Sequence, residues 1–215
     1  MTQVVGVLGY ERILSLASAL PFASARESFI FVRHGETEGN RTRVFQVPHI
    51  PLNETGEAQA RKAARALAGT RIGRVVASPM VRAWRTATLI AETHDLRPEA
   101  DGALAERYYV NLWNTPVGEG LDWAHDPSGC EPIATFVHRT AASLMRILAD
   151  ETTAHEVVVV AHGGSLLVAC ALAGVTLTGD LRRNAVPLRF ELRDGNWRAT
   201  PLVRDDGDQR PSEFT

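Results

Sequence analysis

Three polar clusters containing arginine or histidine directly follow three apolar, β-rich runs of the sequence. The clusters are Arg33-His34-Gly35 after Ser28–Val32, Ser78-Pro79 with Arg82 after Arg74–Ala77, and His162-Gly163-Gly164 after Glu156–Ala161. Continuous apolar runs of this length are typical of strands buried on both faces. Ligands of open α/β sheets bind beyond the carboxyl ends of such strands. The three clusters therefore predict one anion site at a single edge of a sheet.

The residue types in these clusters suit phosphoryl transfer. That reaction needs an in-line nucleophile, positive charge around the transferred group and a proton donor for the leaving oxygen. A neutral imidazole is a competent nucleophile near neutral pH. Arg33 and Arg82 would disfavour protonation of His34 and bind phosphate oxygens. A single histidine at a strand end is more often structural, but two histidines placed with two arginines favour a site.

Helical patterns separate the apolar runs and predict the scaffold that positions the clusters. These patterns cover residues 55–68, 80–94, 133–151 and 163–173. Strands that alternate with helices predict a single α/β domain of three α/β/α layers with a mostly parallel central sheet. Near the end, Leu188–Arg193 and Trp197–Val203 flank Asp194-Gly195-Asn196, which indicates a β-hairpin.

Composition fits an ordinary enzyme-sized domain. The chain has 215 residues, of which 45% are apolar and 22% charged, and its net charge of -2 gives no basic excess for nucleic acid or an anionic membrane. Cys130 and Cys170 lack metal-type spacing and fit a reducing compartment, and Cys170 lies in an apolar run typical of the core. We therefore expect a cytoplasmic protein whose partners do not include nucleic acid or a membrane.

The first 27 residues form an extension ahead of the predicted domain. Ile13–Ala23 is mildly apolar, and Ala23-Ser24-Ala25 is similar to a signal-peptidase site. However, Glu11 and Arg12 directly precede this short apolar stretch, which also contains two serines. We favour an uncleaved helix over an export signal. The domain then covers residues 28–204, and residues 205–215 form a polar tail.

The order of the motifs resembles that of the histidine phosphatase superfamily, which includes cofactor-dependent phosphoglycerate mutases and fructose-2,6-bisphosphatases. The resemblance rests on Arg33-His34-Gly35-Glu36-Thr37, Asn40, Ser78-Pro79-x-x-Arg82-Ala83 and His162-Gly163, between about residues 29 and 173. An Arg-His-Gly alone is a weak signal, whereas the ordered set is specific. The resemblance implies a phosphoglycerate mutase-like fold.

The resemblance also implies roles for individual residues. His34 would be phosphorylated, and Glu106, in a Leu-x-Glu that matches the family, would protonate the leaving oxygen and then activate water. Glu36 is the alternative acid. No metal or organic cofactor follows from this scheme. The phosphate would be held by Arg33, Arg82, His162 and Gly163, with Asn40 at the edge of the pocket.

Two segments depart from the family pattern. The segment 44–52 lacks the usual Gln-Gly pair and has His49 where Asp is usual, and Arg107–Asn114 replaces a Gly-x-Trp-Glu-Gly, with Trp113 as its nearest equivalent. Residues 107–132 contain several aromatic side chains but no period. A loop of this length predicts a lid or substrate loop over the pocket. The alternative is that its aromatic rings only pack the loop onto the domain.

The functional prediction is a phosphatase that hydrolyses phosphomonoesters of small molecules through a phosphohistidine on His34. Mutase relatives carry a longer insertion with basic residues after the acid, whereas no arginine or lysine lies between Tyr108 and Pro132. That absence disfavours a second phosphate clamp. A phosphoglycerate mutase and a catalytically weak phospho-ligand binding or regulatory module are the alternatives. The natural substrate and the formation of a homodimer stay open.

Overall fold

A central six-stranded sheet forms the middle layer of the computed structural model, which describes residues 7–22, 24–118, 120–176 and 178–202. The strand order is β3-β2-β4-β1-β5-β6. The first four strands of this order run parallel, while β5 is antiparallel to β1 and β6 is antiparallel to β5. The predicted mostly parallel sheet and its C-terminal hairpin are thereby confirmed. The strands are β1 Ser28–Arg33, β2 Ile72–Ala77, β3 Glu99–Ala100, β4 Glu156–Ala161, β5 Pro187–Arg193 and β6 Asn196–Pro201.

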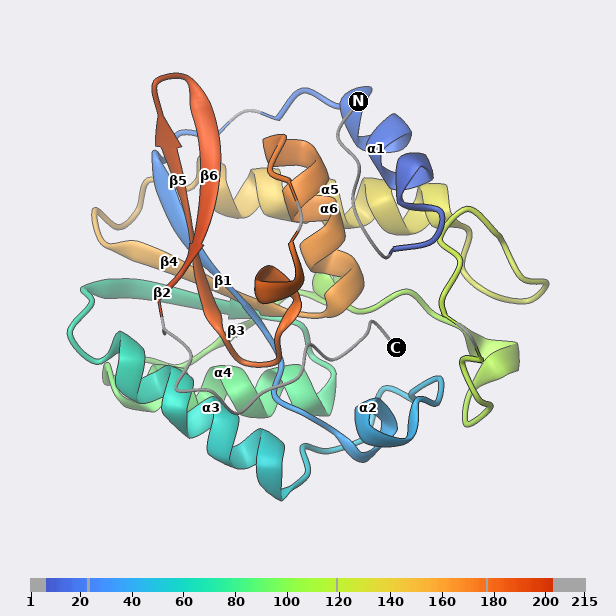
Figure 1. Cartoon of the computed structure of the whole chain (residues 1–215). Coiled ribbons are helices and arrows are strands. Elements are labelled where there is room, and N and C mark those ends of the chain that lie inside the picture. Colours follow the sequence, from blue (N-terminus) through green and yellow to red (C-terminus); the bar gives the residue numbers. More distant parts are fainter. Residues whose placement is uncertain (1–6, 23, 119, 177, 203–215) are drawn as a thin grey trace.

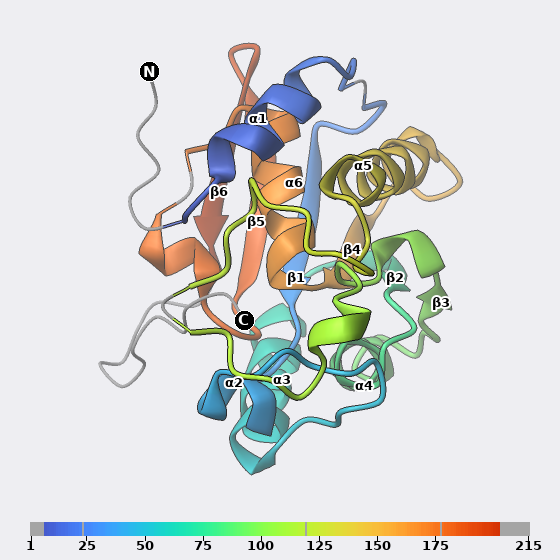
Figure 2. The ribbon, with the colours of Figure 1, turned by 90° about the vertical axis from the view of Figure 1, so that its right-hand side faces the viewer.

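Helices cover both faces of the sheet, which confirms the three-layer prediction. α3 (Glu54–Leu67) and α4 (Val81–Glu92) lie on one face, and α1 (Tyr10–Ser18), α5 (Ile133–Ala149) and α6 (Gly163–Ala173) lie on the other (Figures 1 and 2). A short helix, α2 (Glu38–Thr42), follows β1. Three 3-10 helices complete the described elements: η1 Gly102–Leu104, η2 Val110–Leu112 and η3 Gly179–Arg182. The tail predicted for residues 205–215 lies outside the described residues.

Local capping explains where the main helices begin and end. Asn53 accepts a hydrogen bond from the backbone N–H of Gly56 (2.8 Å) and starts α3. Gly174 adopts a left-handed conformation (φ 63°) that ends α6. The helix predicted for 133–151 ends two residues early because Asp150 already has an extended conformation (ψ 115°).

Within the extension formed by residues 1–27, the described residues contain one α-helix, α1, at Tyr10–Ser18. It begins after Gly9, which has a φ of 76° that favours glycine, and it ends shortly before Pro21. Tyr10 and Ile13 are buried against the α5/α6 layer, and the Tyr10 hydroxyl donates to the carbonyl of Leu167 (3.2 Å). Helix α1 therefore belongs to the hydrophobic core.

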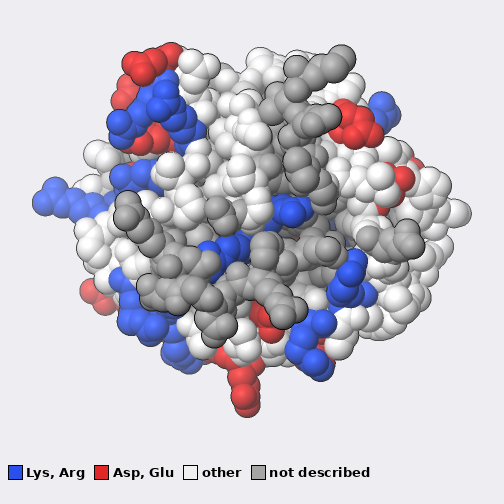
Figure 3. Space-filling model, viewed as in Figure 1, with Lys and Arg blue, Asp and Glu red and all other residues white. Residues whose placement is uncertain are grey.

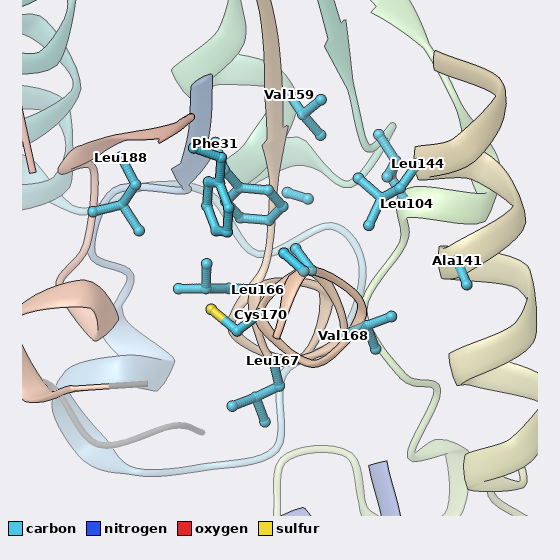
Figure 4. Close-up of a cluster of buried hydrophobic side chains, with 14 of the residues drawn as sticks. Phe31, Leu104, Ala141, Leu144, Val159, Leu166, Leu167, Val168, Cys170 and Leu188 are labelled. Atoms are coloured by element: carbon cyan, nitrogen blue, oxygen red, sulfur yellow. The ribbon is translucent and has the colours of Figure 1, made fainter. Parts of the chain in front are cut away.

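The largest cluster of buried side chains lies between the sheet and the layer of α1, α5 and α6. Figure 4 shows Phe31 and Val159 of the sheet beside α6, with the sulfur of Cys170 inside the cluster, as predicted. Helix α6 is apolar on all sides, which is typical of a helix buried in a core. Burial raises the pKa of the Cys170 thiol to about 12. Strands β1 and β4 are thus held rigidly from both faces, and their carboxyl ends have fixed positions.

The surface carries mixed charge. On the face shown in Figure 3, acidic and basic side chains are interspersed around the edge. Within the described ranges, no helix is both long and apolar enough to span a bilayer.

Candidate active site

The three predicted clusters lie at one edge of the sheet. Strands β1 and β4 pair in parallel with Arg33 opposite Ala161, so His34 and His162 leave the sheet side by side. Their ring centres are 5.2 Å apart, and the ring planes are inclined by 61°. Strand β2 pairs with the other side of β4 and places Ser78 next to His162, while Arg82 lies in the first turn of α4.

His34 is held as a neutral imidazole in one tautomer. Its Nδ1 lies 2.7 Å from the carbonyl oxygen of Gly35, and because a carbonyl only accepts, Nδ1 carries the proton. Nε2 keeps its lone pair and accepts from Nε of Arg82 at 3.3 Å. Burial, and then the charges of Arg82 and Arg33, hold the pKa of His34 well below its usual value. The side chain therefore presents a nucleophilic nitrogen at neutral pH.

Arg33 and Arg82 are both almost fully buried at this edge. Burial lowers the pKa of each to about 10, although the negative charge of Glu106 acts in the opposite direction. Both guanidinium groups therefore stay charged at neutral pH. Arg33 Nη1 donates to the carbonyl of Arg182 (2.9 Å), and Arg82 Nη1 donates to that of Val47 (3.2 Å). Two buried cations this close repel each other, and an anion between them offsets that repulsion.

His162 occupies the N-cap position of α6 and is fully buried. Its Nε2 lies 2.8 Å from Oγ of Ser78. Burial, followed by the charge of Arg82, holds the pKa of His162 well below its usual value. Gly163 is the first residue of α6, so the N-terminal end of this helix, whose backbone N–H groups favour negative charge, lies beside the two histidines.

Glu106 lies at this same helix start, unlike Glu36. Glu106 Oε2 accepts from the backbone N–H of Gly164 (3.0 Å), and Oε1 accepts from that of Arg107 (2.9 Å). The side chain of Glu36 instead accepts from Nδ2 of Asn53 (2.8 Å), at the start of α3. The negative charge of Glu106 acts to raise the pKa of both buried arginines, so its carboxylate lies near them.

Asn40 lies next to the site. Asn184, a residue that the sequence patterns did not single out, lies between Asn40 and His34. Asn40 closes the capping box of α2, where its Oδ1 accepts from the backbone N–H of Thr37 (3.2 Å). Nδ2 of Asn184 donates to the carbonyl of His34 (2.8 Å) and lies 3.5 Å from Oδ1 of Asn40. Asn184 thus joins the stretch before β5 to the His34 backbone.

The loop 107–132 is packed closely over this edge. It pairs with the segment after α2, where the backbone of Phe45 exchanges hydrogen bonds with Thr115 (2.9 Å) and Asn114 (2.8 Å). The rings of Phe45 and Tyr109 lie 4.9 Å apart. Trp123 is buried against Phe136. Figure 2 shows the loop running between α2 and α1.

A small enclosed cavity of about 20 Å³ lies under this loop. Arg82 and Glu106 line it from the domain, while Tyr109, Leu121 and Trp123 line it from the loop. Trp123, an aromatic residue of the predicted lid segment, is one of these lining residues, whereas Trp113 is not among the described residues that line the cavity. The volume suits one water molecule. A larger open depression, at the amino ends of the strands, lies away from both histidines.

Residues 29–200 match the family model of the histidine phosphatase superfamily (branch 1). The chain belongs to this superfamily. It is 32% identical over 210 residues to an agropine synthesis reductase of Rhizobium rhizogenes, a match that covers 91% of this chain but 47% of that protein. The chain therefore spans about half the length of this curated relative.

Two further likenesses confirm the predicted family and fold. The chain is 31% identical over 174 residues to the uncharacterized phosphatase PhoE of Bacillus subtilis, with 78% of this chain and 89% of that protein covered. A mycobacterial glucosyl-3-phosphoglycerate phosphatase, solved with VO3, superposes with a TM-score of 0.67 at 22% identity over 84% of this chain and 99% of that chain. At this identity the second likeness shows the fold alone.

The structure brings His34, Arg33, Arg82, His162 and Glu106 together, with Gly163 and Asn40 at the border. His49, His138 and His155 are exposed and lie outside this group. The sequence patterns did not indicate Asn184. Trp123 lies in the predicted lid segment, whose lack of a period gave no indication of which of its aromatic residues is buried.

Proposed function

We propose that this histidine phosphatase hydrolyses phosphomonoesters of small molecules through a phosphohistidine on Nε2 of His34. The observation that carries this proposal is the tautomer of His34. Its Nδ1–H is taken up by the Gly35 carbonyl, so the lone pair of Nε2 lies beside the buried Arg82 cation. A neutral nucleophile next to a fixed cation suits attack on a phosphate ester.

In the first step, Nε2 of His34 attacks phosphorus, an N–P bond forms, and the P–O bond to the alcohol breaks. The leaving oxygen takes a proton from Glu106. Arg33, Arg82 and the helix start at Gly163 oppose the negative charge on the phosphoryl oxygens. These groups are already ordered by the fold, so they need little reorganisation as the charge develops.

In the second step, the Glu106 carboxylate accepts a proton from water while the oxygen of that water attacks phosphorus. The N–P bond breaks, inorganic phosphate leaves, and Nε2 regains its lone pair. Because Glu106 is then protonated again, the site is ready for another turnover.

A phosphoglycerate mutase would retain the phosphoryl group for a second acceptor and would need a further anion clamp in the loop. The loop side of the cavity is formed instead by Tyr109, Leu121 and Trp123. Arg107 is the basic residue that the loop does contribute, and its guanidinium is engaged by Asp126 and by the carbonyls of Glu131 and His125. This arrangement supports release to water over transfer.

The proposal is tested by phosphate release from para-nitrophenyl phosphate and from a panel of small phosphate esters between about pH 5 and pH 8. Rapid acid-free quenching and mass spectrometry should locate an acid-labile phosphoryl group on the peptide containing His34. The His34→Ala variant should lose both signals. No phosphate release from any ester would overturn the proposal, as would phosphoglycerate interconversion without free phosphate, which would identify a mutase.

A further inference from the structure

Ser78 connects the end of β2 to His162. It is fully buried, and its backbone N–H donates to the carbonyl of Val160 (3.0 Å). Its Oγ lies 2.8 Å from Nε2 of His162, and the same oxygen accepts from the backbone N–H of Met80 at 3.3 Å. These contacts fix the position of the hydroxyl from two directions.

The hydrogen atoms of this small network can be assigned by counting donors and acceptors. A serine hydroxyl has one donor and two acceptor sites. The Met80 N–H occupies one acceptor site of Ser78. If Nε2 of His162 were protonated, it would occupy the other, and the Ser78 hydrogen would be buried with no acceptor in the described part of the chain. If Ser78 donates to Nε2, the hydroxyl hydrogen and Nε2 are both paired and only Nδ1 of His162 lacks a partner, so this assignment leaves fewer buried polar groups unsatisfied.

This assignment leaves the proton of His162 on Nδ1. That nitrogen is buried and has no hydrogen-bond partner among the described residues. It belongs to a ring beside His34, in the field of the Arg82 and Arg33 cations. Burial and these charges hold the pKa of His162 well below its usual value, so the ring is neutral and bears a single N–H. A buried donor without a partner is suited to a phosphoryl oxygen.

We propose that Ser78 is a positioning residue, whose hydroxyl donates to Nε2 of His162 and so keeps the Nδ1–H available for the phosphoryl group. Both histidines then share one tautomer but present opposite nitrogens. His34 gives its N–H to a carbonyl and presents a lone pair, whereas His162 accepts a hydroxyl proton and presents an N–H. The reverse tautomer of His162 would direct a lone pair at an anion. The catalytic part of this inference rests on the proposed function.

The first test reads the tautomer directly in the resting protein. Nitrogen-15 NMR of histidine-labelled protein, assigned with a His162→Gln variant, should show Nδ1 protonated and Nε2 unprotonated in His162 at neutral pH. In Ser78→Ala the Nε2–H form should become populated. An Nε2–H tautomer in the unmodified protein overturns the inference, and so does an unchanged tautomer in Ser78→Ala.

The second test measures what the tautomer does. Ser78→Ala should lower kcat and weaken orthovanadate binding by about 10- to 100-fold, the range seen when a partner that orients a metal-bound histidine is removed. Ser78→Thr, which keeps the hydroxyl, should recover most of both. The matched control is Ser165→Ala, because Ser165 is also buried and its hydroxyl donates to the carbonyl of Leu104 (3.3 Å) rather than to a histidine ring.

These outcomes separate two failures. If Ser165→Ala loses as much vanadate affinity as Ser78→Ala, Ser78 has only a structural role and the inference is wrong. If the tautomer is as stated but no ester releases phosphate, the proposed function fails while the hydrogen-bond assignment stands. If Ser78→Ala does not fold, the spectrum of the unmodified protein still decides between the two tautomers.

Discussion

Nε of Arg82 donates to Nε2 of His34 across 3.3 Å, so a cation expected to bind phosphate is hydrogen-bonded to the atom expected to attack it. A phosphoryl group that enters the site competes for that N–H. The arginine therefore exchanges one acceptor for another without leaving its place. Binding of the phosphoryl group would thus free the lone pair of Nε2 of His34 in the same step.

Replacing Arg82 with Ala should raise KM and lower kcat together. The loss removes charge from the bound ester and from the more anionic transition state, and kcat/KM should fall by about 100-fold or more. Steady-state kinetics and vanadate titration measure the two effects. Arg85→Ala, one turn further along α4, removes only a partly exposed ion pair with Glu57 and should change kcat/KM by less than about twofold. Equal losses in both variants would refute this role for Arg82.

Replacing Glu106 with Gln should affect esters according to their leaving group. A proton donor matters most when the leaving alkoxide is strongly basic, so hydrolysis of an alkyl phosphate should slow by about 100-fold or more. The phosphorylation step with para-nitrophenyl phosphate should slow far less, because para-nitrophenolate leaves without protonation. Burst kinetics separate this step from the second. In Glu36→Gln, where the carboxylate contacts Asn53, both esters should be affected equally.

The stability of the protein should fall as the pH drops below about 6.5, the ordinary pKa of histidine. His34 and His162 have pKa values well below this in the folded state, so the unfolded chain binds more protons in that range. As the pH falls, each histidine should lower the free energy of unfolding by about 1.4 kcal/mol per pH unit until the pH reaches its pKa in the folded state. Above pH 6.5 neither contributes a slope.

Urea unfolding at a series of pH values measures this dependence. A His34→Gln variant should lose one of the two contributions, whatever its stability at pH 7.5. Identical slopes in both proteins between about pH 6 and pH 5 would show that His34 is protonated normally in the folded state.

Gly164→Ala should impair turnover because the site has no room for a side chain at position 164. An added Cβ would lie 2.3 Å from Oε1 of Glu106 and 2.5 Å from the ring of Trp123. We expect a loss of about 1–3 kcal/mol in stability from the overpacking, and a clear loss of kcat as Glu106 is displaced. Gly69→Ala is the control, since a Cβ there meets nothing within 4 Å. Thermal unfolding and kcat are measured for both.

Gly9→Ala should loosen the loop that covers the cavity. Gly9 has a φ of 76°, and a Cβ would lie 2.2 Å from the backbone nitrogen of Ala124. The preceding residue, Leu8, accepts the backbone N–H of Trp123 (3.0 Å). We expect faster hydrogen exchange at residues 121–124. We also expect KM to rise less with the bulk of an aryl ester than it does in the unmodified protein.

Gly118→Ala separates strain from contact at that position. Gly118 also has a positive φ (72°), but a Cβ there meets nothing within 4 Å. Its substitution should cost about 1–2 kcal/mol of conformational strain without changing exchange at 121–124. Matching exchange profiles in the two variants would contradict a specific role for the residues before α1.

The candidate residues at the strand ends could be predicted because each follows an apolar run. Parallel strands place their carboxyl ends at the same edge of the sheet, so these residues were expected there. Arg33, His34 and His162 are of this kind. Asn184 could not be found in this way, because it lies in an irregular stretch before β5, and no local pattern indicates that β5 pairs with β1. The burial of Trp123 could not be inferred locally, because its ring packs against Phe136 and its backbone N–H donates to Leu8, far away in the sequence. β3 spans only two residues, too few for any periodicity.

The pairing of β1 with β4 also sets when the site can exist during translation. His34 is synthesised before the strand that stands beside it, Glu156–Ala161. A nascent chain that ends before Glu156 already contains His34, both arginines and Glu106 but lacks the strand that pairs with β1 beside them. The chemistry proposed for His34 would therefore have to wait until β4 has been made and has paired with β1.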